Sequence, residues 1–500
     1  MHHCTRRRFL QSSLLAGGAA LLSRVRLASA VTSGSPNGDL RVAVVGLNGQ
    51  GAGYIRTFAG LPGTRLVALC DADETVLNQR ALEAEAGGAK PTRYRDFRRL
   101  LEDRDVDAVV IATPNHWHSL MTIWALEAGK DVYVEKPLSH NVWEGRQAVE
   151  AAKKYSSRIV MAGTQNRSSA DLHEAIAYVR SGQLGKIQWA RGLCYKLRES
   201  IGRTTGPQSV PASVDYDLWT GPAALLPPRR NGAKGSVHYD WHWFWNYGGG
   251  DINNQGVHQM DVARWMLGET GYPASVMSVG GRFGYQDDAE TPNTLISVFN
   301  YEKAPLIFEV RGLPAQAGMR AMGRYRAAQI GVILQCEGGY VHVTEGGNAT
   351  IYDQADRKIQ IFTNAGNISA VHREAFVKAV RDRKVTVGQI GDCHVSTSLG
   401  HFGNISYLLG AGQTNPAVSE AIQASEPTRE AFGRMLEHLK VNDVGGETTR
   451  SVLGPLLTID GAKEKVSGPD SAIAAAANQS LLMKRPGRAP FLVPDLQRTA

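Results

Sequence analysis

The feature that most constrains the fold is an alternation of short β-branched runs with helical stretches early in the chain. Five such runs occur, at Leu40–Val45, Arg65–Cys70, Val106–Thr113, Asp131–Glu135 and Arg158–Ala162. They recur about every 25–40 residues with helical sequence between them, which is the pattern of βαβ units in a parallel sheet. The sequence therefore predicts an α/β dinucleotide-binding (Rossmann) domain over residues 39–162.

A glycine-rich turn, GLNGQG at residues 46–51, follows the first run directly. A dinucleotide fold needs glycines here for a sharp turn, for close backbone approach to the pyrophosphate and for helix packing. The pyrophosphate then lies at a helix N-terminus, where free N–H groups favour an anion. Asn48 replaces the usual middle glycine, but Asn tolerates left-handed backbone. We expect cofactor contacts from Gly46, Asn48, Gly49, Gln50 and Gly51.

Asp71 follows the second run, twenty residues after the turn. An acidic residue at this place binds the adenosine ribose hydroxyls and repels a 2′-phosphate. This predicts NAD rather than NADP. The alternative interpretation is that Asp71 is an ordinary turn residue.

The net positive charge of the chain comes largely from its first thirty residues. The chain has 55 Lys and Arg against 47 Asp and Glu, a formal charge of +8. Residues 1–30 contain five arginines and no acid, and without them 50 basic residues face 47 acidic ones. No long basic run remains, which argues against a nucleic-acid partner. A hydrophobic content of 43% excludes a disordered or collagen-like chain.

The N-terminus has the pattern of an export signal. TRRRFLQ at residues 5–11 resembles the twin-arginine signature, and small residues follow at Ala28–Ala30. The apolar stretch Leu10–Leu22 is too short for a lasting membrane anchor, which needs about 20 residues. We expect a twin-arginine signal peptide at 1–30, a linker at 31–38 and a periplasmic protein exported in the folded state. The alternative is a frayed basic helix.

Cysteine and histidine spacing predicts neither a disulfide framework nor a metal site. Four cysteines beyond the leader are scattered without a CxxC pair: Cys70, Cys194, Cys336 and Cys393. Two histidine pairs lack a third ligand at sensible spacing: His116 with His118, and His238 with His242.

The pattern changes after residue 163, where longer loops and aromatic residues begin. Candidate strands lie at Ile187–Leu193, Thr294–Phe299, Leu306–Arg311 and Tyr340–Thr344, and candidate helices at Val371–Val380 and Val395–Leu409. This predicts an α+β domain over 163–410 with a mostly antiparallel sheet. The polar extension at 411–500 is expected to wrap the surface.

Two further segments carry a family resemblance. They read ATPNHWHSLMTIWALEAGKDVYVEKP at 112–137 and GGGDINNQGVHQMDVARW at 248–265. With the first strand and turn, they resemble the glucose-fructose oxidoreductase and inositol dehydrogenase (Gfo/Idh/MocA) family from about residue 39 onward. DYDLWTGPA at 215–223 and WHWFWNYGGG from Trp241 resemble a secreted bacterial branch. The resemblance implies a Rossmann domain, a large open sheet used for oligomer contacts, and therefore a homo-oligomer (dimer or tetramer).

The resemblance also implies that Lys136 and His258 stand beside the nicotinamide. Oxidising a sugar alcohol removes a hydride from carbon and a proton from oxygen. A neutral His is a suitable base near pH 7, and a lysine ammonium polarises the oxygen. Glu135 is expected to orient Lys136. The remaining cofactor contacts are expected from Thr113, Asn115, His118, Glu135 and Lys136.

Asn254 stands where many relatives carry Asp, four residues before the histidine. An amide cannot favour imidazolium as a carboxylate does. Either His258 works without that support, or Asp251 or Asp261 substitutes for it. Asn254 can still bond a sugar hydroxyl. The expected substrate contacts are Gln165, Asn166, Arg167, Asn254, Asp261 and Trp243, although the aromatic run around Trp243 is also typical of a core or interface.

Three functions fit these residues. The first is a periplasmic NAD-dependent oxidoreductase that acts on CH–OH groups of sugars or polyols. Because a periplasm has no obvious pool of free nicotinamide cofactor, such an enzyme should hold its NAD tightly and show ping-pong kinetics. The second is a redox-neutral glycosidase or lyase that works by transient sugar oxidation. The third is a non-catalytic nucleotide- or sugar-binding protein.

Overall fold

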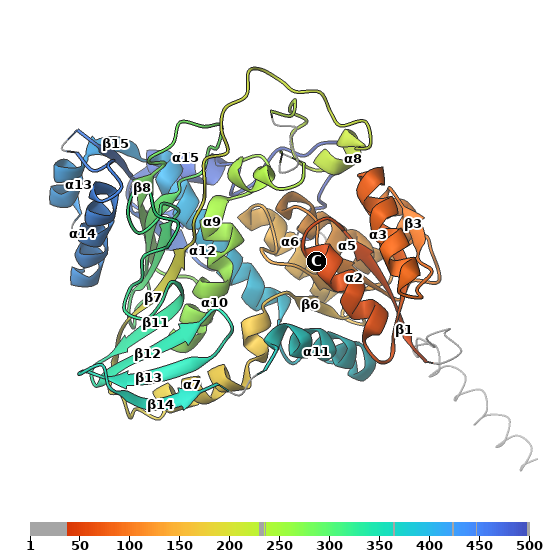
Figure 1. Cartoon of the computed structure of the whole chain (residues 1–500), viewed down its shortest axis with the longest axis horizontal. Helices are drawn as coiled ribbons and strands as arrows, with labels where there is room; N and C mark the ends of the chain where they lie inside the picture. Colours follow the sequence, from red (N-terminus) through yellow and green to blue (C-terminus); the bar gives the residue numbers. More distant parts are fainter. Residues whose placement is uncertain are drawn as a thin grey trace, which may run out of the picture.

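The computed structural model describes residues 38–497 apart from 230–234, 236, 364–365, 423–424 and 447. The expected signal peptide and almost all of the linker lie outside the described residues. Figure 1 shows two α/β units side by side, with the N-terminal unit in red and orange and a large sheet in the second unit in green. No helix within the described ranges is long and apolar enough to cross a bilayer.

The first unit is built on a parallel sheet with the order β3-β2-β1-β4-β5-β6, as the strand spacing predicts. Its strands are β1 (Leu40–Val45), β2 (Thr64–Cys70), β3 (Thr92–Tyr94), β4 (Ala108–Ile111), β5 (Asp131–Val134) and β6 (Val160–Ala162). The helices between them are α2 (Gln50–Gly60), α3 (Glu74–Ala86), α4 (Phe97–Leu101), α5 (His118–Glu127) and α6 (Val142–Lys154). β1 is buried along its whole length because helices cover both faces of the sheet.

One face of this sheet is completed by a helix from much later in the chain. Helix α11 (Ile368–Asp382) packs Phe376 and Val380 into the cluster that also holds Tyr54 and Phe58 of α2. The boundary expected at residue 162 therefore does not contain the whole core of the Rossmann unit.

The second unit contains a twelve-stranded sheet with the path β14-β13-β12-β11-β7-β10-β9-β8-β16-β15, and β17 pairs with β8 and β18. All these pairings are antiparallel except the one between β7 and β10. The strands are β7 (Ile187–Tyr195), β8 (Ser275–Gly281), β9 (Thr294–Asn300), β10 (Leu306–Arg311), β11 (Ile330–Cys336), β12 (Gly339–Thr344), β13 (Ala349–Asp353), β14 (Lys358–Phe362), β15 (Ala411–Thr414), β16 (Arg450–Leu453), β17 (Leu457–Asp460) and β18 (Lys465–Ser467). The predicted α/β class with a large, mostly antiparallel second sheet is confirmed.

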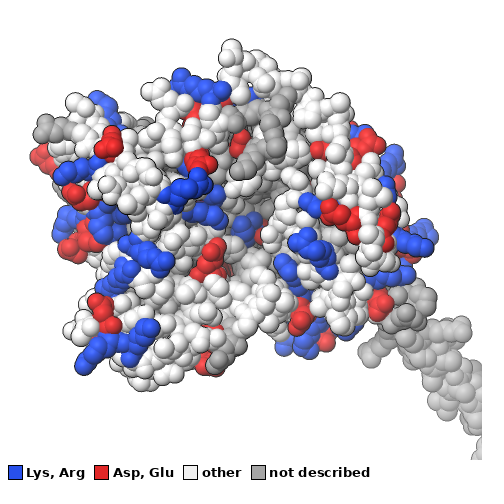
Figure 2. Space-filling model, in the orientation of Figure 1, with Lys and Arg blue, Asp and Glu red and all other residues white. Residues whose placement is uncertain are grey.

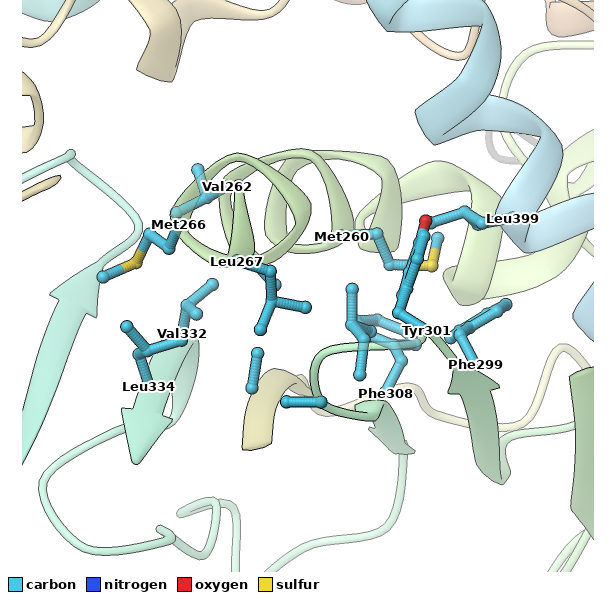
Figure 3. Close-up of a cluster of buried hydrophobic side chains, with 14 of the residues drawn as sticks. Met260, Val262, Met266, Leu267, Phe299, Tyr301, Phe308, Val332, Leu334 and Leu399 are labelled. Carbon is cyan, nitrogen blue, oxygen red and sulfur yellow. The ribbon is translucent and has the colours of Figure 1, made fainter. Parts of the chain in front are cut away.

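Helices cover the inner face of this sheet and carry part of the site. Helix α10 (Gly256–Leu267) lays Met260 and Leu267 over Phe308 and Val332 of the strands, as Figure 3 shows. Helix α12 (Ile390–Leu409) and the short helix α9 (Gly250–Asn254) pack beside it. The remaining elements of this unit are η2 (Gln165–Ser168), α7 (Ala170–Arg180), α8 (Tyr216–Thr220) and η3 (Asp240–Trp243). This core fixes the helix that bears His258.

The C-terminal extension does more than wrap the surface. Its helix α14 (Glu426–Lys440) packs Phe432 and Met435 on the other face of the sheet, next to α13 (Asn415–Ala421). Strands β15 to β18 join the sheet itself, and α15 (Ser471–Gln479) follows them. The last described residues return to the Rossmann unit, where Phe491 packs edge-on against Trp117.

Candidate active site

A cavity of about 520 Å³ lies where the carboxyl ends of the Rossmann strands face the second unit. Figure 2 shows the surface hollowed between the two units, with basic and acidic side chains at the rim. The glycine turn and Asp71 line one end, called here the adenosine end. Lys136, Asn254 and His258 line the other, called here the catalytic end. In open α/β sheets ligands bind in this place.

The glycine turn has the backbone that a dinucleotide requires. Gly46 has a φ of +80°, and a Cβ there would lie 2.7 Å from the Ala112 carbonyl oxygen. A Cβ on Gly51 would lie 1.8 Å from the Gly46 carbonyl oxygen. A Cβ on Gly49 would meet nothing within 4 Å. The outer two glycines therefore serve packing, and the middle one leaves room beside the cavity.

The N-terminus of α2 fits an anionic group. Gly49 precedes the helix, no side chain caps it, and no acidic residue lies in its first turn. Free N–H groups with the positive end of the helix dipole suit a pyrophosphate. The buried Thr113 hydroxyl, which also lines the cavity, has no hydrogen-bond partner within the described part of the chain. Both observations agree with a polar, anionic cofactor in this cavity.

Asp71 is fixed at the end of β2. Its carboxylate accepts the N–H of Leu47 at 2.7 Å and the N–H of Asp73 at 2.9 Å. Burial raises the pKa of this carboxyl group. Each carboxylate oxygen holds one backbone donor and keeps acceptor capacity for a ribose hydroxyl. Asp71 is thus a turn residue and a candidate ribose ligand at once.

The segment after β4 supplies Thr113, Asn115 and His118 to the cavity wall. Asn115 is buried and begins the short helix η1 (Asn115–Trp117). His118 braces the wall, because its Nδ1 lies 2.6 Å from the Pro137 carbonyl oxygen and its Nε2 lies 2.8 Å from that of Thr113. His118 therefore connects the end of β4 to the segment Glu135–Pro137, which follows β5.

Lys136 lies just after β5, and its side chain reaches the second unit. Its Nζ donates to the main-chain oxygen of Asn254 at 2.9 Å, and burial lowers its pKa. Glu135 is buried and accepts the Lys136 N–H at 3.0 Å and the Gln165 side-chain amide at 3.3 Å. The Tyr54 hydroxyl also donates to it. Glu135 thereby fixes the backbone that carries Lys136.

His258 lies in the first turn of α10 and shares the catalytic end with Lys136. Burial, followed by the nearby Lys136 charge, lowers the pKa of His258 to about 3. The imidazole is therefore neutral at neutral pH and can accept a proton. The side chains of Asn254 and Gln165 line the same space.

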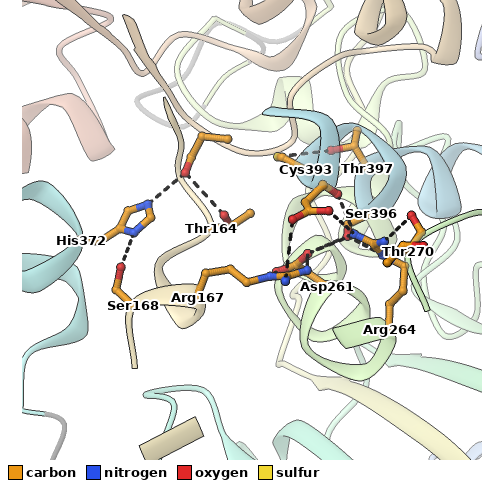
Figure 4. A network of polar contacts seen from close by, with 12 residues as sticks. Thr164, Arg167, Ser168, Asp261, Arg264, Thr270, His372, Cys393, Ser396 and Thr397 are labelled. Carbon is orange, nitrogen blue, oxygen red and sulfur yellow. Dashed lines mark hydrogen bonds and ion pairs between the residues drawn. The ribbon is translucent and has the colours of Figure 1, made fainter. Parts of the chain in front are cut away.

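The two carboxylates expected to replace the missing Asp are engaged elsewhere. Asp261 accepts Arg167 Nε and NH2 at 2.8 and 2.9 Å and the Ser396 hydroxyl at 2.8 Å, as Figure 4 shows. Asp251 accepts Arg198 Nε at 2.8 Å and NH2 at 2.6 Å. Neither carboxylate lines the cavity. His258 therefore has no carboxylate hydrogen-bond partner among the described residues, and the Asp261 charge only partly opposes the lowering of its pKa.

Three of the expected substrate residues lie outside the cavity lining. Arg167 and Asp261 form the buried ion pair of Figure 4. A buried charge without an opposite charge beside it would be strongly destabilising. Trp243 is buried, with the Arg198 guanidinium 4.9 Å from its ring centre. Its neighbours Trp241 and His242 line the cavity instead. These three residues contact side chains that are distant in the sequence, and no local motif indicates such contacts.

Several other cavity residues were not predicted from the sequence. They are Leu218, Trp219, Val237, His238, Tyr239, Glu345, Ile368 and Ser369. The segment DYDLWTGPA contains the first two, so its presence in the resemblance was a usable signal. The turn that carries Glu345 has no such motif. No group of three His, Cys, Asp or Glu side chains within the described ranges could hold a metal ion.

Two family models match this chain. Residues 40–164 match the oxidoreductase family model of the NAD-binding Rossmann fold, and residues 179–298 match the model of its C-terminal alpha/beta domain. This chain belongs to the Gfo/Idh/MocA oxidoreductase family. Its N-terminal unit is an NAD-binding Rossmann domain.

Curated relatives of this Gfo/Idh/MocA protein include glycosyl hydrolase family 109 proteins. The protein from Shewanella pealeana is 30% identical over 201 residues, covering 36% of this chain and 44% of the relative. The protein from Solibacter usitatus is 34% identical over 168 residues, covering 31% and 38%. The chain thus spans less than half of the length of these relatives.

Solved structures share the fold. Levoglucosan dehydrogenase in complex with NADH and levoglucosan has a TM-score of 0.55 at 18% identity, covering 73% of this chain and 96% of that one. The aldose-aldose oxidoreductase of Caulobacter crescentus in complex with glycerol has a TM-score of 0.51 at 21% identity, covering 72% and 94%. At these identities the likeness concerns the fold.

Proposed function

We propose that this protein is a periplasmic oxidoreductase that transfers a hydride between tightly held NAD and a sugar, polyol or sugar derivative. The observation that carries the proposal is the shared catalytic end of the cavity. There a lysine ammonium and a neutral imidazole, Lys136 and His258, face one space that is continuous with the glycine turn.

His258 and Lys136 act on the same substrate oxygen in different ways. His258 accepts the proton of the hydroxyl group, because its lowered pKa leaves the imidazole unprotonated. Lys136 donates a hydrogen bond to the same oxygen and stabilises its developing negative charge. Bound NAD supplies the hydride acceptor for the carbinol carbon. In the reverse direction His258 returns the proton to a carbonyl oxygen.

A covering segment, residues 213–223, supports the tight hold on NAD. It crosses from the second unit to the Rossmann domain, where the Glu74 N–H donates to the Ser213 oxygen at 2.9 Å and the Asp215 N–H donates to the Ala72 oxygen at 3.0 Å. Both bonds lie next to the end of β2, where Asp71 stands. The segment therefore closes over the adenosine end of the cavity.

Three more contacts fasten the covering segment. The Trp219 oxygen accepts the Trp117 indole N–H at 3.0 Å, and the Trp219 side chain lines the cavity. From the C-terminal extension, Arg488 donates to the Gly221 oxygen at 2.7 Å and to the Asp217 oxygen at 2.9 Å. A cofactor under a segment fastened on both sides leaves only when these contacts break.

The periplasmic part of the proposal rests on TRRRFLQ and the small residues that follow it. The twin-arginine route carries folded proteins, which suits an enzyme that leaves the cytoplasm with its NAD in place. A bound cofactor must be reoxidised in the site, so one sugar reduces it and a second carbonyl compound reoxidises it. The homo-oligomer stays a prediction.

The first experiment tests retention. The exported protein is purified without added cofactor and denatured, and the released nucleotide is identified by chromatography. Stoichiometric NAD or NADH supports the proposal and leads to sugar panels followed at the nicotinamide absorbance. Release of NADP would overturn the role given to Asp71. An empty protein that also fails to bind NAD would contradict the catalytic proposals.

A redox-neutral glycosidase is the second candidate, favoured by the names of the curated relatives. In that reaction transient oxidation acidifies a neighbouring C–H bond, the glycosidic bond is eliminated, and the electrons return to the sugar. Release of an aglycone with no net change in bound NADH selects this function. A non-catalytic binding protein is selected if Lys136→Ala and His258→Ala keep ligand binding and no substrate is ever turned over.

A further inference from the structure

A tight turn brings Glu345 to the catalytic end of the cavity. The turn joins β12 to β13 and is held against the start of α7, where the Ser169 hydroxyl donates to the Gly347 oxygen at 2.9 Å. Gly347 has a φ of +78°, and a Cβ there would lie 2.9 Å from the Ser169 side chain. The position of Glu345 therefore follows from packing of the hairpin tip.

Gln255 holds the Glu345 carboxylate from behind. Its side chain is buried between α9 and α10, three residues before His258. The amide nitrogen donates to Glu345 Oε1 at 3.1 Å, and the amide oxygen accepts from Lys196 Nζ at 3.3 Å. Lys196 does not line the cavity. The Lys196 ammonium is therefore outside the cavity, whereas the Glu345 carboxylate lines it.

A second acceptor in the same wall has no partner. Asn166 is only 5% exposed, lines the cavity, and has no hydrogen-bond partner for its Oδ1 within the described residues. A Cβ on Gly347 would lie 3.3 Å from this oxygen, so it is close to the turn that bears Glu345. A buried acceptor without a donor costs free energy. Asn166 packs against the turn and supports the position of Glu345.

The other carboxylates near the catalytic end are already engaged. Asp251 and Asp261 bind arginines, and Glu135 is buried with three donors. Glu345 is exposed to the cavity and holds one donor, from Gln255. This wall therefore presents the Glu345 carboxylate, with its negative charge, to the substrate.

We propose that Glu345, positioned by Gln255 and assisted by Asn166, determines substrate specificity. It accepts hydrogen bonds from hydroxyl groups of a neutral sugar next to the carbon that is oxidised, and it repels sugar acids. This inference rests on the proposed function and deepens it. A polar site built to bind hydroxyl donors discriminates strongly against ligands that lack them.

The test compares neutral sugars with their acids in the purified holoprotein. Glucose, galactose, glucuronate and galacturonate are the probes, and their binding is measured by calorimetry as well as by reduction of bound NAD. We expect Glu345→Gln to raise KM and Kd for the neutral sugar about tenfold with little change in kcat, since a hydrogen bond to a charged group is lost. Asn166→Ala is expected to act in the same direction.

A charge reversal and a control make the test decisive. Glu345→Lys is expected to bind the uronates more tightly than the neutral sugars, while Glu302→Gln, an exposed change in the turn after β9, should leave both unchanged. Unchanged KM, Kd and selectivity in both Glu345 variants overturn the inference. If the unaltered protein binds sugars but never reduces its NAD with any of them, the proposed function fails, and the binding data still decide the role of Glu345.

Discussion

The adenosine end and the catalytic end of the cavity differ in how the chain builds them. The adenosine end is formed mainly by backbone that directly follows β1 and β2, where glycines and one carboxylate meet fixed geometric needs. The catalytic end is formed by side chains from α9, α10, η2, the segment that follows β5 and the β12–β13 turn. Local sequence therefore specifies the first end, and tertiary packing specifies the second.

The largest effect is expected at the catalytic end from Lys136→Ala. Loss of the ammonium removes the donor to the substrate oxygen, and turnover should fall by about 10²–10⁴-fold. The NAD content should stay the same because the glycine turn is untouched. Single-turnover reduction of the bound cofactor by a substrate sugar measures the loss, and chromatography of released nucleotide is the control. Full activity in this variant would remove Lys136 from the mechanism.

Gly51→Ala is expected to have the opposite effect, on NAD binding rather than on the catalytic groups. Its Cβ would lie 1.8 Å from the Gly46 oxygen, so the turn must shift and the purified protein should lose its NAD. Gly53→Ala in the same helix is the matched control, since its Cβ meets nothing within 4 Å and Gly53 does not line the cavity. Nucleotide content and melting temperature are measured for both. Stoichiometric NAD in Gly51→Ala would show that the turn is not where the pyrophosphate binds.

The same contrast explains how far the sequence alone predicts this molecule. β1, the glycine turn and Asp71 lie close together along the chain, so their pattern is visible without a structure. Helix α11, which begins at residue 368, packs into the Rossmann core, and no local sequence pattern predicts this packing. Strands such as β3 and β18 have three residues each, too few for a hydrophobic period.

The site residues were likewise only partly predictable from the sequence. Lys136 and His258 were found through family motifs, and the structure places them at one end of one cavity. Arg167 and Asp261 are polar residues near those motifs, but they bind each other across 94 positions of sequence. Glu345 was missed because only the fold brings its turn to the cavity. A polar residue near a motif does not reveal whether its partner is a ligand or another side chain.

A smaller effect, on pH dependence, is expected from Asn254→Asp. In the unaltered protein the pKa of His258 is lowered to about 3, so protonation of this base should reduce kcat/KM only in strong acid. A carboxylate at 254 favours the imidazolium and should raise that pKa by about one unit or more. The acid limb of the pH–rate profile then moves to higher pH. Asn254→Ala adds no charge, so an equal shift in that variant would refute the electrostatic explanation.

The smallest effect is expected where the covering segment closes the adenosine end. Arg488→Ala removes the bonds from the C-terminal extension to Asp217 and Gly221, at a site where the arginine side chain is 20% exposed. Partly exposed ion pairs contribute about 0–1 kcal/mol, so NAD should dissociate at most about fivefold faster. The rate is followed by fluorescence after dilution into excess competing nucleotide.

Arg357→Ala is the matched control for that variant, because it breaks an exposed ion pair with Asp353 beside β13, at the opposite side of the second unit. Its dissociation rate should equal that of the unaltered protein. A combined Arg488→Ala and His238→Ala variant sharpens the measurement, since His238 lies 3.2 Å from Asp73 across the adenosine end. If this double variant also releases NAD at the unaltered rate, neither the Arg488 bonds to the covering segment nor the His238 contact retains the cofactor, and retention is expected from the glycine turn and Asp71.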